Sequence, residues 1–379
     1  MEKFYQTERL TEVICLKSRL FWTRSTTFFD QERNAMEPMR FKFKYLNEQG
    51  QETGFFSRKG HFDGHTLVLD TTEIPASDIY EVDHRGNRMV LVEARDEQHP
   101  TTIVFAVNSG SVPDLKQALG VARSAAAAAR RKQQLTEQGL GNTFHEVVCP
   151  HCSATNDLTG FRDSPQISCQ FCHAVATVAG APEEEKHYRL CDECGMYSKP
   201  RQFTVFYFYF LLVVYGWSSR QTWRCPGCMR GEAWKMLFGN LIFVLGVPVA
   251  IIQLIRAYGG TDLSSMYKGL DGANLKARSG RMEAAIVDYR RILERQPESA
   301  GVKYNIGLAF AQQNELQAAA KTLEAALNDC ANYQPAANLL AHCYAQLGED
   351  EKLADLRAEW GAEGDDVQED TVDLLEEEQ

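Results

Sequence analysis

Four Cys-x-x-Cys pairs define residues 149–228 of this chain: Cys149-Pro150-His151-Cys152, Cys169-Gln170-Phe171-Cys172, Cys191-Asp192-Glu193-Cys194 and Cys225-Pro226-Gly227-Cys228. The pairs contain eight of the eleven cysteines. Two thiolates three positions apart bind one metal ion from a single tight turn, and two such turns complete a tetrahedral site. We therefore expect two structural Zn²⁺ sites, each closed by four thiolates.

The spacing of the pairs predicts two zinc ribbons. Sixteen residues separate the first two pairs, which is typical of a ribbon over residues 145–180. The other two pairs are thirty residues apart and define a ribbon at 188–232 with a hydrophobic insert. His151 and His173 are expected to be spare, since four thiolates fill each coordination sphere. Thiolates kept free for metal also indicate a reducing compartment.

Two long apolar runs accompany the cysteines. Residues 236–255 contain no charged side chain, and as a helix they would be about 30 Å long, enough to cross a bilayer core. Trp234 and Tyr258 flank this run where interfacial aromatic residues belong. The sequence therefore predicts a transmembrane helix over 234–258.

The other run, residues 203–217, also lacks charge but favours strand, because it is rich in Phe, Tyr and Val. A membrane crossing here would separate the cysteine pairs of the second ribbon by about 30 Å. Ribbon strands lying at the membrane interface are therefore favoured over a two-span hairpin. Arg220, Arg224 and Arg230 would keep the zinc domains on the cytosolic side of the cytoplasmic membrane.

Residues 38–137 show the alternation of short strands followed by one Ala-rich helix, whereas residues 1–37 are ambiguous. This segment resembles a bacterial pleckstrin-homology (PH)-like domain. The resemblance is carried by Phe62-Asp63-Gly64, Thr66–Leu69, Ile74-Pro75-Ala76, Asp78-Ile79, Asn87–Leu91 and Leu115–Leu119. It implies a possible phospholipid-headgroup site at Lys42, Lys44, Arg58 and Lys59. An ordinary solvated strand face is the favoured interpretation of those cations.

An internal repeat occupies residues 262–361. Gly280, Asn314 and Gly348 lie thirty-four residues apart, each at the expected turn between two helices. Period and small-residue placement resemble three tetratricopeptide (TPR) repeats. The resemblance implies an all-α solenoid that binds a protein or peptide partner. The acidic tail at 362–379 is expected to be disordered.

Together these features predict a multi-domain α+β protein that resembles bacterial membrane-associated zinc-ribbon proteins. We expect a membrane-associated adaptor that binds a protein partner through its repeats, and not an enzyme. The alternatives are a zinc-responsive regulator and a thiol-redox protein using its Cys-x-x-Cys pairs. Nucleic-acid binding is disfavoured, because residues 145–235 carry nine Lys or Arg against nine Asp or Glu.

Overall fold

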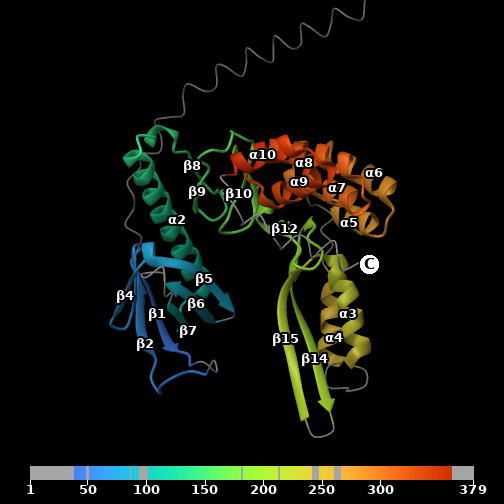
Figure 1. Ribbon diagram of the computed structural model, residues 1–379. Helices are drawn as coiled ribbons and strands as arrows, with labels where there is room; N and C mark the ends of the chain where they lie inside the picture. The colour runs from blue at the N-terminus through green and yellow to red at the C-terminus, as the bar shows by residue number, and fades with distance from the viewer. Residues whose placement is uncertain are drawn as a thin grey trace, which may run out of the picture.

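The structure is a computed structural model of the chain. It describes residues 38–47, 51–85, 87–93, 101–180, 182–211, 214–240, 247–259 and 266–360. The ambiguous segment at 1–37 and the acidic tail at 362–379 lie outside these residues. Figure 1 shows a mixed α+β chain, as expected, with a curled sheet at one end and a block of helices at the other.

Seven strands and one helix form the first unit, here called the β-domain. The strands are β1 (Met39–Tyr45), β2 (Arg58–Phe62), β3 (Thr66–Leu69), β4 (Thr72–Pro75), β5 (Ile79–Arg85), β6 (Arg88–Glu93) and β7 (Thr101–Ser109). They pair antiparallel in the order β4-β3-β2-β1-β7-β6-β5. A strand that packs one face on a core alternates buried and exposed residues. Phe41, Lys42 and Phe43 of β1 follow this pattern.

The helix α2 (Val112–Glu137) covers one face of this sheet. It begins where Ser111 Oγ accepts a hydrogen bond from the backbone N–H of Asp114, a typical N-terminal cap. Leu115 and Leu119 from its first turns join the buried core of the sheet. Farther along, Ser124 Oγ accepts from the backbone N–H of Thr155 at 2.9 Å, so α2 also contacts the cysteine-rich region.

Three short hairpins carry the first three Cys-x-x-Cys pairs in their turns. They are β8 (Glu146–Val148) with β9 (Thr155–Asp157), β10 (Gln166–Ser168) with β11 (Val175–Thr177), and β12 (Arg189–Leu190) with β13 (Tyr197–Ser198). The fourth pair lies at the start of a helix instead. The hairpins are too small to bury a core of their own, which is the situation that metal binding compensates.

An apolar arm extends from the last hairpin. It consists of the strands β14 (Arg201–Leu211) and β15 (Val214–Arg224) and the helices α3 (Pro226–Asn240) and α4 (Val247–Tyr258). The two helices pack on each other and on β14, around Phe203, Met229 and Met236. The strand structure agrees with the expectation for residues 203–217.

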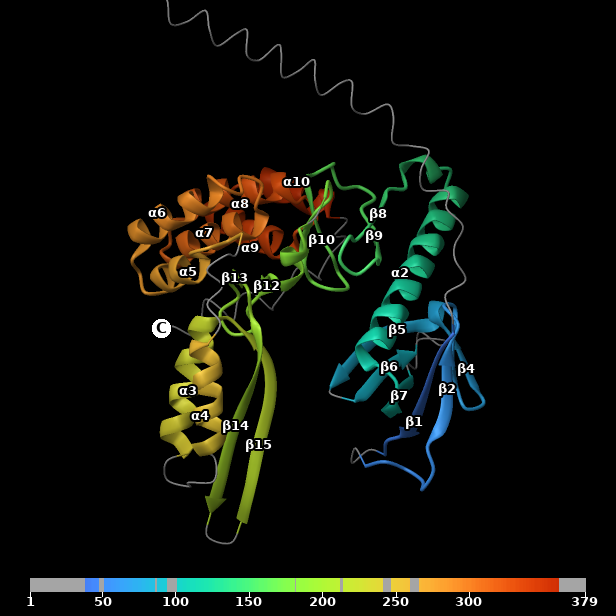
Figure 2. The same cartoon turned by 180° about the vertical axis from the view of Figure 1, so that it is seen from behind.

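The structure does not support the transmembrane helix predicted over 234–258. That segment contains the end of α3 and the whole of α4, which lie side by side instead of forming one continuous rod (Figures 1 and 2). Gly239 and Asn240 are poor helix formers, and Pro248 belongs to the first turn of a helix. The connection at 241–246 lies outside the described residues. Within the part of the chain that the structure describes, every helix is too short or too polar to cross a bilayer.

Three helix pairs complete the fold. They are α5 (Leu270–Arg278) with α6 (Met282–Leu293), α7 (Ala300–Gln312) with α8 (Leu316–Asp329), and α9 (Gln334–Leu347) with α10 (Asp350–Glu359). Gly280, Asn314 and Gly348 lie between the helices of each pair and have φ of 73°, 60° and 69°. The thirty-four-residue spacing thus marks the left-handed residue that reverses the chain in each pair.

Candidate metal centres and the groove of the helix pairs

The eight predicted cysteines form two compact groups. Cys149, Cys152, Cys169 and Cys172 make the first group, and Cys191, Cys194, Cys225 and Cys228 make the second. In each group all four sulfur atoms lie within 4.8 Å of one another. The ten cysteines that the structure describes form no disulfide. Each Cys-x-x-Cys turn is here called a knuckle. The predicted pairing of the four knuckles into two groups is therefore confirmed.

The sulfur spacing fits a tetrahedral metal ion. A metal bonded to four sulfurs at about 2.3 Å places those sulfurs about 3.8 Å apart. The Sγ atoms of Cys149 and Cys172 are 3.8 Å apart, and those of Cys152 and Cys169 are 3.5 Å apart. In the second group Cys194 and Cys225 are separated by 3.9 Å. Each group can thus hold one ion without rearrangement, although its geometry does not identify the metal.

Local backbone geometry aims the two sulfurs of each knuckle at one point. In the first three knuckles the residue after the second cysteine has a left-handed φ: 62° at Ser153, 59° at His173 and 63° at Gly195. The N–H of each of these residues donates to the carbonyl of the first cysteine at 2.9 Å. The turn closes in one tight loop, which brings both thiols to the same side.

The fourth knuckle uses a helix start instead. The backbone N–H of Met229 donates to the carbonyl of Cys225 at 2.9 Å, within the first turn of α3. The N–H of Cys228 donates to the sulfur of Cys225 at 3.4 Å, and the N–H of Cys225 donates to the sulfur of Cys191 at 3.2 Å. Backbone donors and the positive end of the helix dipole both stabilise thiolate here.

Crowding of the thiols separates their acidities. The hydrogen bond from Cys152 lowers the pKa of Cys149 to about 6. Hydrogen bonds from the neighbouring thiols drive the pKa of Cys191 far down and that of Cys225 far up. Each group therefore contains a cysteine with a lowered pKa, which favours the thiolate form that binds a metal cation.

The second group has an additional positive charge. Arg278, the last residue of α5, donates from Nη1 to the sulfur of Cys228 at 3.0 Å. A divalent ion with four thiolates carries a net charge of about −2, which this guanidinium partly offsets. Arg224 bridges the two knuckles of the group, with ion pairs of 2.7 Å to Glu193 and 3.3 Å to Glu232. The second metal centre is thereby tied to both the arm and the helix pairs.

Neither histidine near the first group belongs to it, as the sequence predicts. The ring of His151 is buried and its Nε2 lies 3.5 Å from Oε2 of Glu185. Glu185 also accepts hydrogen bonds from the backbone N–H and the hydroxyl of Thr177, at 2.8 and 2.6 Å. These contacts link the first ribbon to the segment that leads into the second, so His151 has a structural role.

The helix pairs bind the knuckle segments along the side where α5, α7 and α9 lie, here called the groove. Asn332 receives the backbone N–H of Ser168 at Oδ1 and donates from Nδ2 to its carbonyl, both at 2.8 Å. Close by, the N–H of Ala300 donates to Gln166 Oε1 at 3.0 Å. The side-chain amide of Asn332 thus hydrogen-bonds to the backbone of β10 as a neighbouring strand would.

Tyr197 in the second ribbon is held in the same manner. Asn305 Oδ1 accepts from its backbone N–H at 2.7 Å, while Asn305 Nδ2 and Asn274 Nδ2 donate to its carbonyl at 2.7 and 3.0 Å. Its ring packs with Tyr188 and Tyr267 and lies directly over Gly301. The chain's own hairpins therefore occupy the groove in which the resemblance to TPR repeats would place a partner.

These groove residues were not singled out from the sequence. Asn274, Asn305 and Asn332 do not share the thirty-four-residue period, and an isolated asparagine gives no signal of its own. Their common feature is burial of a polar side chain, on α5, on α7 and in the connection between α8 and α9. That pattern is visible only once the facing surface is known.

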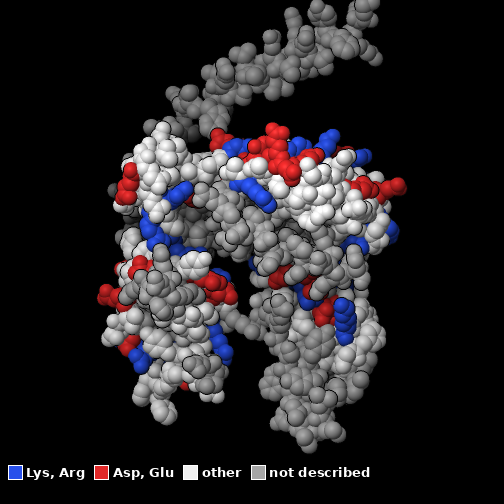
Figure 3. Space-filling view, in the orientation of Figure 1, with Lys and Arg blue, Asp and Glu red and all other residues white. Residues whose placement is uncertain are grey.

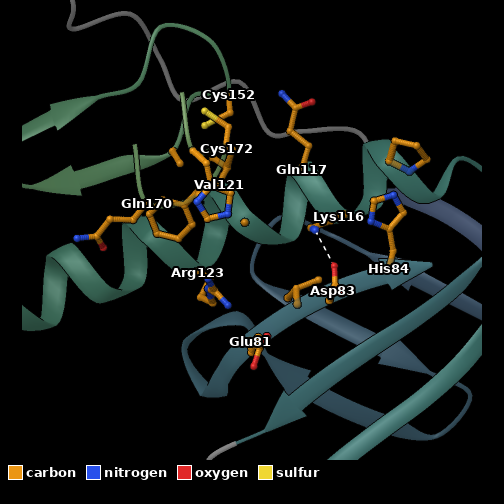
Figure 4. Close-up of a pocket in the computed structure, with 16 residues that line it drawn as sticks. Glu81, Asp83, His84, Lys116, Gln117, Val121, Arg123, Cys152, Gln170 and Cys172 are labelled. Atoms are coloured by element: carbon orange, nitrogen blue, oxygen red, sulfur yellow. Dashed lines mark hydrogen bonds and ion pairs between the residues drawn. The ribbon is translucent and has the colours of Figure 1, made fainter. Parts of the chain in front are cut away.

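A cavity of about 590 Å³ lies between the β-domain and the first cysteine group (Figure 4). Asp83 and Lys116 meet across it in an ion pair of 3.0 Å, and Arg123 from α2 donates to the carbonyl of Tyr80 at 2.6 Å. His173 also lines the cavity, and burial lowers its pKa. Two carboxylates, Glu81 and Asp83, and two cations, Lys116 and Arg123, line the cavity, so it selects no particular ligand charge.

The chain was compared with known proteins once this geometry was established. No protein-family model matches it, and no curated protein matches its sequence.

Proposed function

We propose that the chain is a non-catalytic scaffold that two zinc ions stabilise and that its apolar arm attaches to a membrane surface. In this proposal the β-domain is PH-like, the hairpins are zinc ribbons and the helix pairs are TPR-like repeats. Tetrahedral groups of four thiolates are typical of structural zinc and leave no open coordination position. The membrane attachment rests on one observation, the polarity of the arm.

Polarity in α4 is reversed relative to a helix of a water-soluble core. Ile252 and Ile255 are 56% and 68% exposed, whereas Gln253 is only 5% exposed. The side-chain oxygen of Gln253 has no hydrogen-bond partner among the described residues. A helix in water normally turns its isoleucines inward and its glutamine outward. The reversed arrangement is favourable when lipid surrounds the outer face.

The neighbouring helix α3 shows the same reversal. Asn240 is fully buried and donates to the carbonyl of Met236 at 2.7 Å, while Phe238 is exposed. Trp234 donates from Nε1 to the hydroxyl of Tyr258 at 3.2 Å, and both residues are exposed. Tryptophan and tyrosine at one level of an apolar surface are typical of the membrane–water interface.

The size of the arm fits insertion without crossing. At 1.5 Å per residue, α3 and α4 are about 22 and 18 Å long, against about 30 Å for a bilayer core. In the hairpin, Arg220 pairs with Val205, and the six residue pairs beyond it, from Phe206↔Ser219 to Leu211↔Val214, contain no charge. Those pairs extend about 20 Å. In α3 the residues after Lys235, and in α4 the residues before Arg256, likewise contain no charge.

The reducing conditions that free thiolates require place the zinc ribbons on the cytosolic side of the cytoplasmic membrane. A protein partner of the repeats remains part of the proposal. Because Tyr197 and Ser168 occupy the groove, such a partner would bind the side formed by α6 and α8 or would displace these segments. Figure 1 shows α6 and α8 on the side away from the hairpins.

The test is binding of the full-length protein to phosphatidylcholine vesicles, measured by co-sedimentation. Changing Ile255 to Asn should lower the partition coefficient about tenfold or more, because burying an Ile side chain contributes about 2 kcal/mol. Val287→Asn is the matched control, since Val287 is an exposed β-branched residue on α6. Its effect on binding should be absent. Equal binding by the Ile255→Asn variant and the unmodified chain would refute membrane attachment through the arm.

A further inference from the structure

Two adjacent aromatic side chains of the β-domain have no packing partner. Phe55 is 97% exposed and Phe56 is 89% exposed, in the connection between β1 and β2. They are the two most exposed large apolar residues in the part of the chain that the structure describes. Phe41, Phe43, Phe62 and Phe105 of the same domain are all buried. A pair of phenylalanines directed into water is unfavourable and therefore marks a contact surface.

Cations lie on the outer faces of β1 and β2, the two strands that this connection joins. Lys42 lies directly opposite Lys59, and Arg40 lies opposite His61. Like charges on directly paired residues are destabilising. None of the residues that the structure describes forms an ion pair with Lys42 or Lys59. An anionic surface would remove this repulsion, whereas a neutral or cationic partner would not.

The phenylalanine pair and the arm lie at the same end of the molecule. Figures 1 and 2 are opposite views, and in both the β1–β2 connection and the free ends of β14, β15, α3 and α4 project to the bottom. In Figure 3 the lower end of the β-domain is mostly uncharged on the side that faces the viewer. Two projections with a common direction match a flat surface.

We propose that Phe55 and Phe56 form a second membrane contact that enters the same anionic bilayer leaflet as the apolar arm. This inference rests on the proposed function and adds to it the orientation of the whole chain. The phenylalanine rings enter the interface, and Lys42 and Lys59 lie among the lipid phosphates. With two contacts the β-domain and the ribbons both face the membrane, and the outer helices of the repeats face the cytosol.

The experiment compares vesicles of phosphatidylcholine alone with vesicles that also contain phosphatidylglycerol. The Phe55→Ser/Phe56→Ser variant should partition about tenfold or more weakly onto both, because two apolar side chains are lost. The Lys42→Gln/Lys59→Gln variant should lose only the preference for anionic vesicles. Tyr80→Ser is the matched control, since Tyr80 is an exposed aromatic residue of β5 in the same domain.

The outcomes separate the second contact from the first. If Ile255→Asn abolishes binding while the double serine variant binds like the unmodified chain, the arm is the sole contact and this inference is wrong. If Ile255→Asn has no effect, the proposed function itself fails. Equal weakening by Tyr80→Ser would also overturn the inference, since the phenylalanines would then have no special role. Loss of self-association in lipid-free solution by the serine variant would identify a second copy of the chain as the occupant instead.

Discussion

Replacement of Gly301 by alanine tests the placement of the β12–β13 hairpin against the helix pairs. A Cβ atom on Gly301 would lie 2.3, 2.4 and 2.6 Å from the Cδ1, Cγ and Cε1 atoms of Tyr197. The Tyr197 ring is only 1% exposed and its backbone is held by two asparagines, so it cannot move aside. The substitution therefore forces the hairpin away from α7.

The magnitude follows from two opposing effects. Overpacking of an enclosed side chain costs about 1–3 kcal/mol. Alanine in place of glycine within a helix contributes about 1 kcal/mol in the opposite direction. Because the added Cβ would lie only 2.3 Å from an immobile ring, the overpacking cost falls in the upper part of that range, about 2–3 kcal/mol, and the net expectation is a loss of about 1–2 kcal/mol. Gly272 is the matched control, because it lies near the start of α5 and a Cβ there meets nothing within 4 Å. Gly272→Ala should stabilise the protein by about 0.5–1 kcal/mol.

Hydrogen exchange measures the effect locally, which matters because a chain of several units does not unfold in one step. In the Gly301→Ala variant, amides of residues 188–198 should exchange about tenfold faster, since a loss of 1.4 kcal/mol is a tenfold change in opening. Combining it with Tyr197→Ala should abolish the cost of the added methyl group. Slower exchange in Gly301→Ala, as in Gly272→Ala, would refute the contact between Tyr197 and α7.

Three further predictions concern the metal centres and the groove. Elemental analysis of the purified chain should give two zinc ions, and Cys191→Ser should reduce the number to one, whereas Cys343→Ser should leave it at two because Cys343 belongs to neither group. Asn305→Ala removes three hydrogen bonds of 2.7, 2.7 and 3.0 Å. It should lower the free energy of opening at residues 196–198 by about 2–4 kcal/mol, measured by hydrogen exchange. Arg278→Gln removes the cation next to Cys228, so one of the two ions should be released at lower chelator concentration, while the exposed Arg281→Gln serves as control. Release of both ions together in Arg278→Gln would contradict the distinct environments of the two groups.

Local spacing was enough to predict the metal centres and the helix pairs. A Cys-x-x-Cys turn specifies its own geometry within about six residues, as the left-handed φ at Ser153, His173 and Gly195 shows. Similarly, the thirty-four-residue spacing of Gly280, Asn314 and Gly348 locates the turns of the helix pairs. In both cases a short segment contains all the information on the structure it forms.

Interactions between distant segments were not predictable in the same way. Ser168 and Asn332 are 164 residues apart, and Tyr197 and Asn305 are 108 apart. No single segment indicates that a ribbon fills the groove. The transmembrane prediction lacks support for a related reason, because hydropathy over 236–255 does not report that α3 and α4 pack on each other and on β14, or that Asn240 and Gln253 are buried. The length of an apolar run specifies a possible span, whereas tertiary packing determines whether the helix is continuous.

The hydrogen bonds between Asn305 and Tyr197 can form only late in the synthesis of the chain on the ribosome. Tyr197 leaves the ribosome 108 residues before Asn305 does, and at about 5–20 residues per second that interval lasts about 5–20 s. During this time the ribbons exist without the helices that cover Tyr188 and Tyr197. Metal capture by the first group, complete at Cys172, can precede all of the helix pairs. Until the last helix pair has been translated, the aromatic side chains of Tyr188 and Tyr197 therefore lack the helices that bury them in the folded chain.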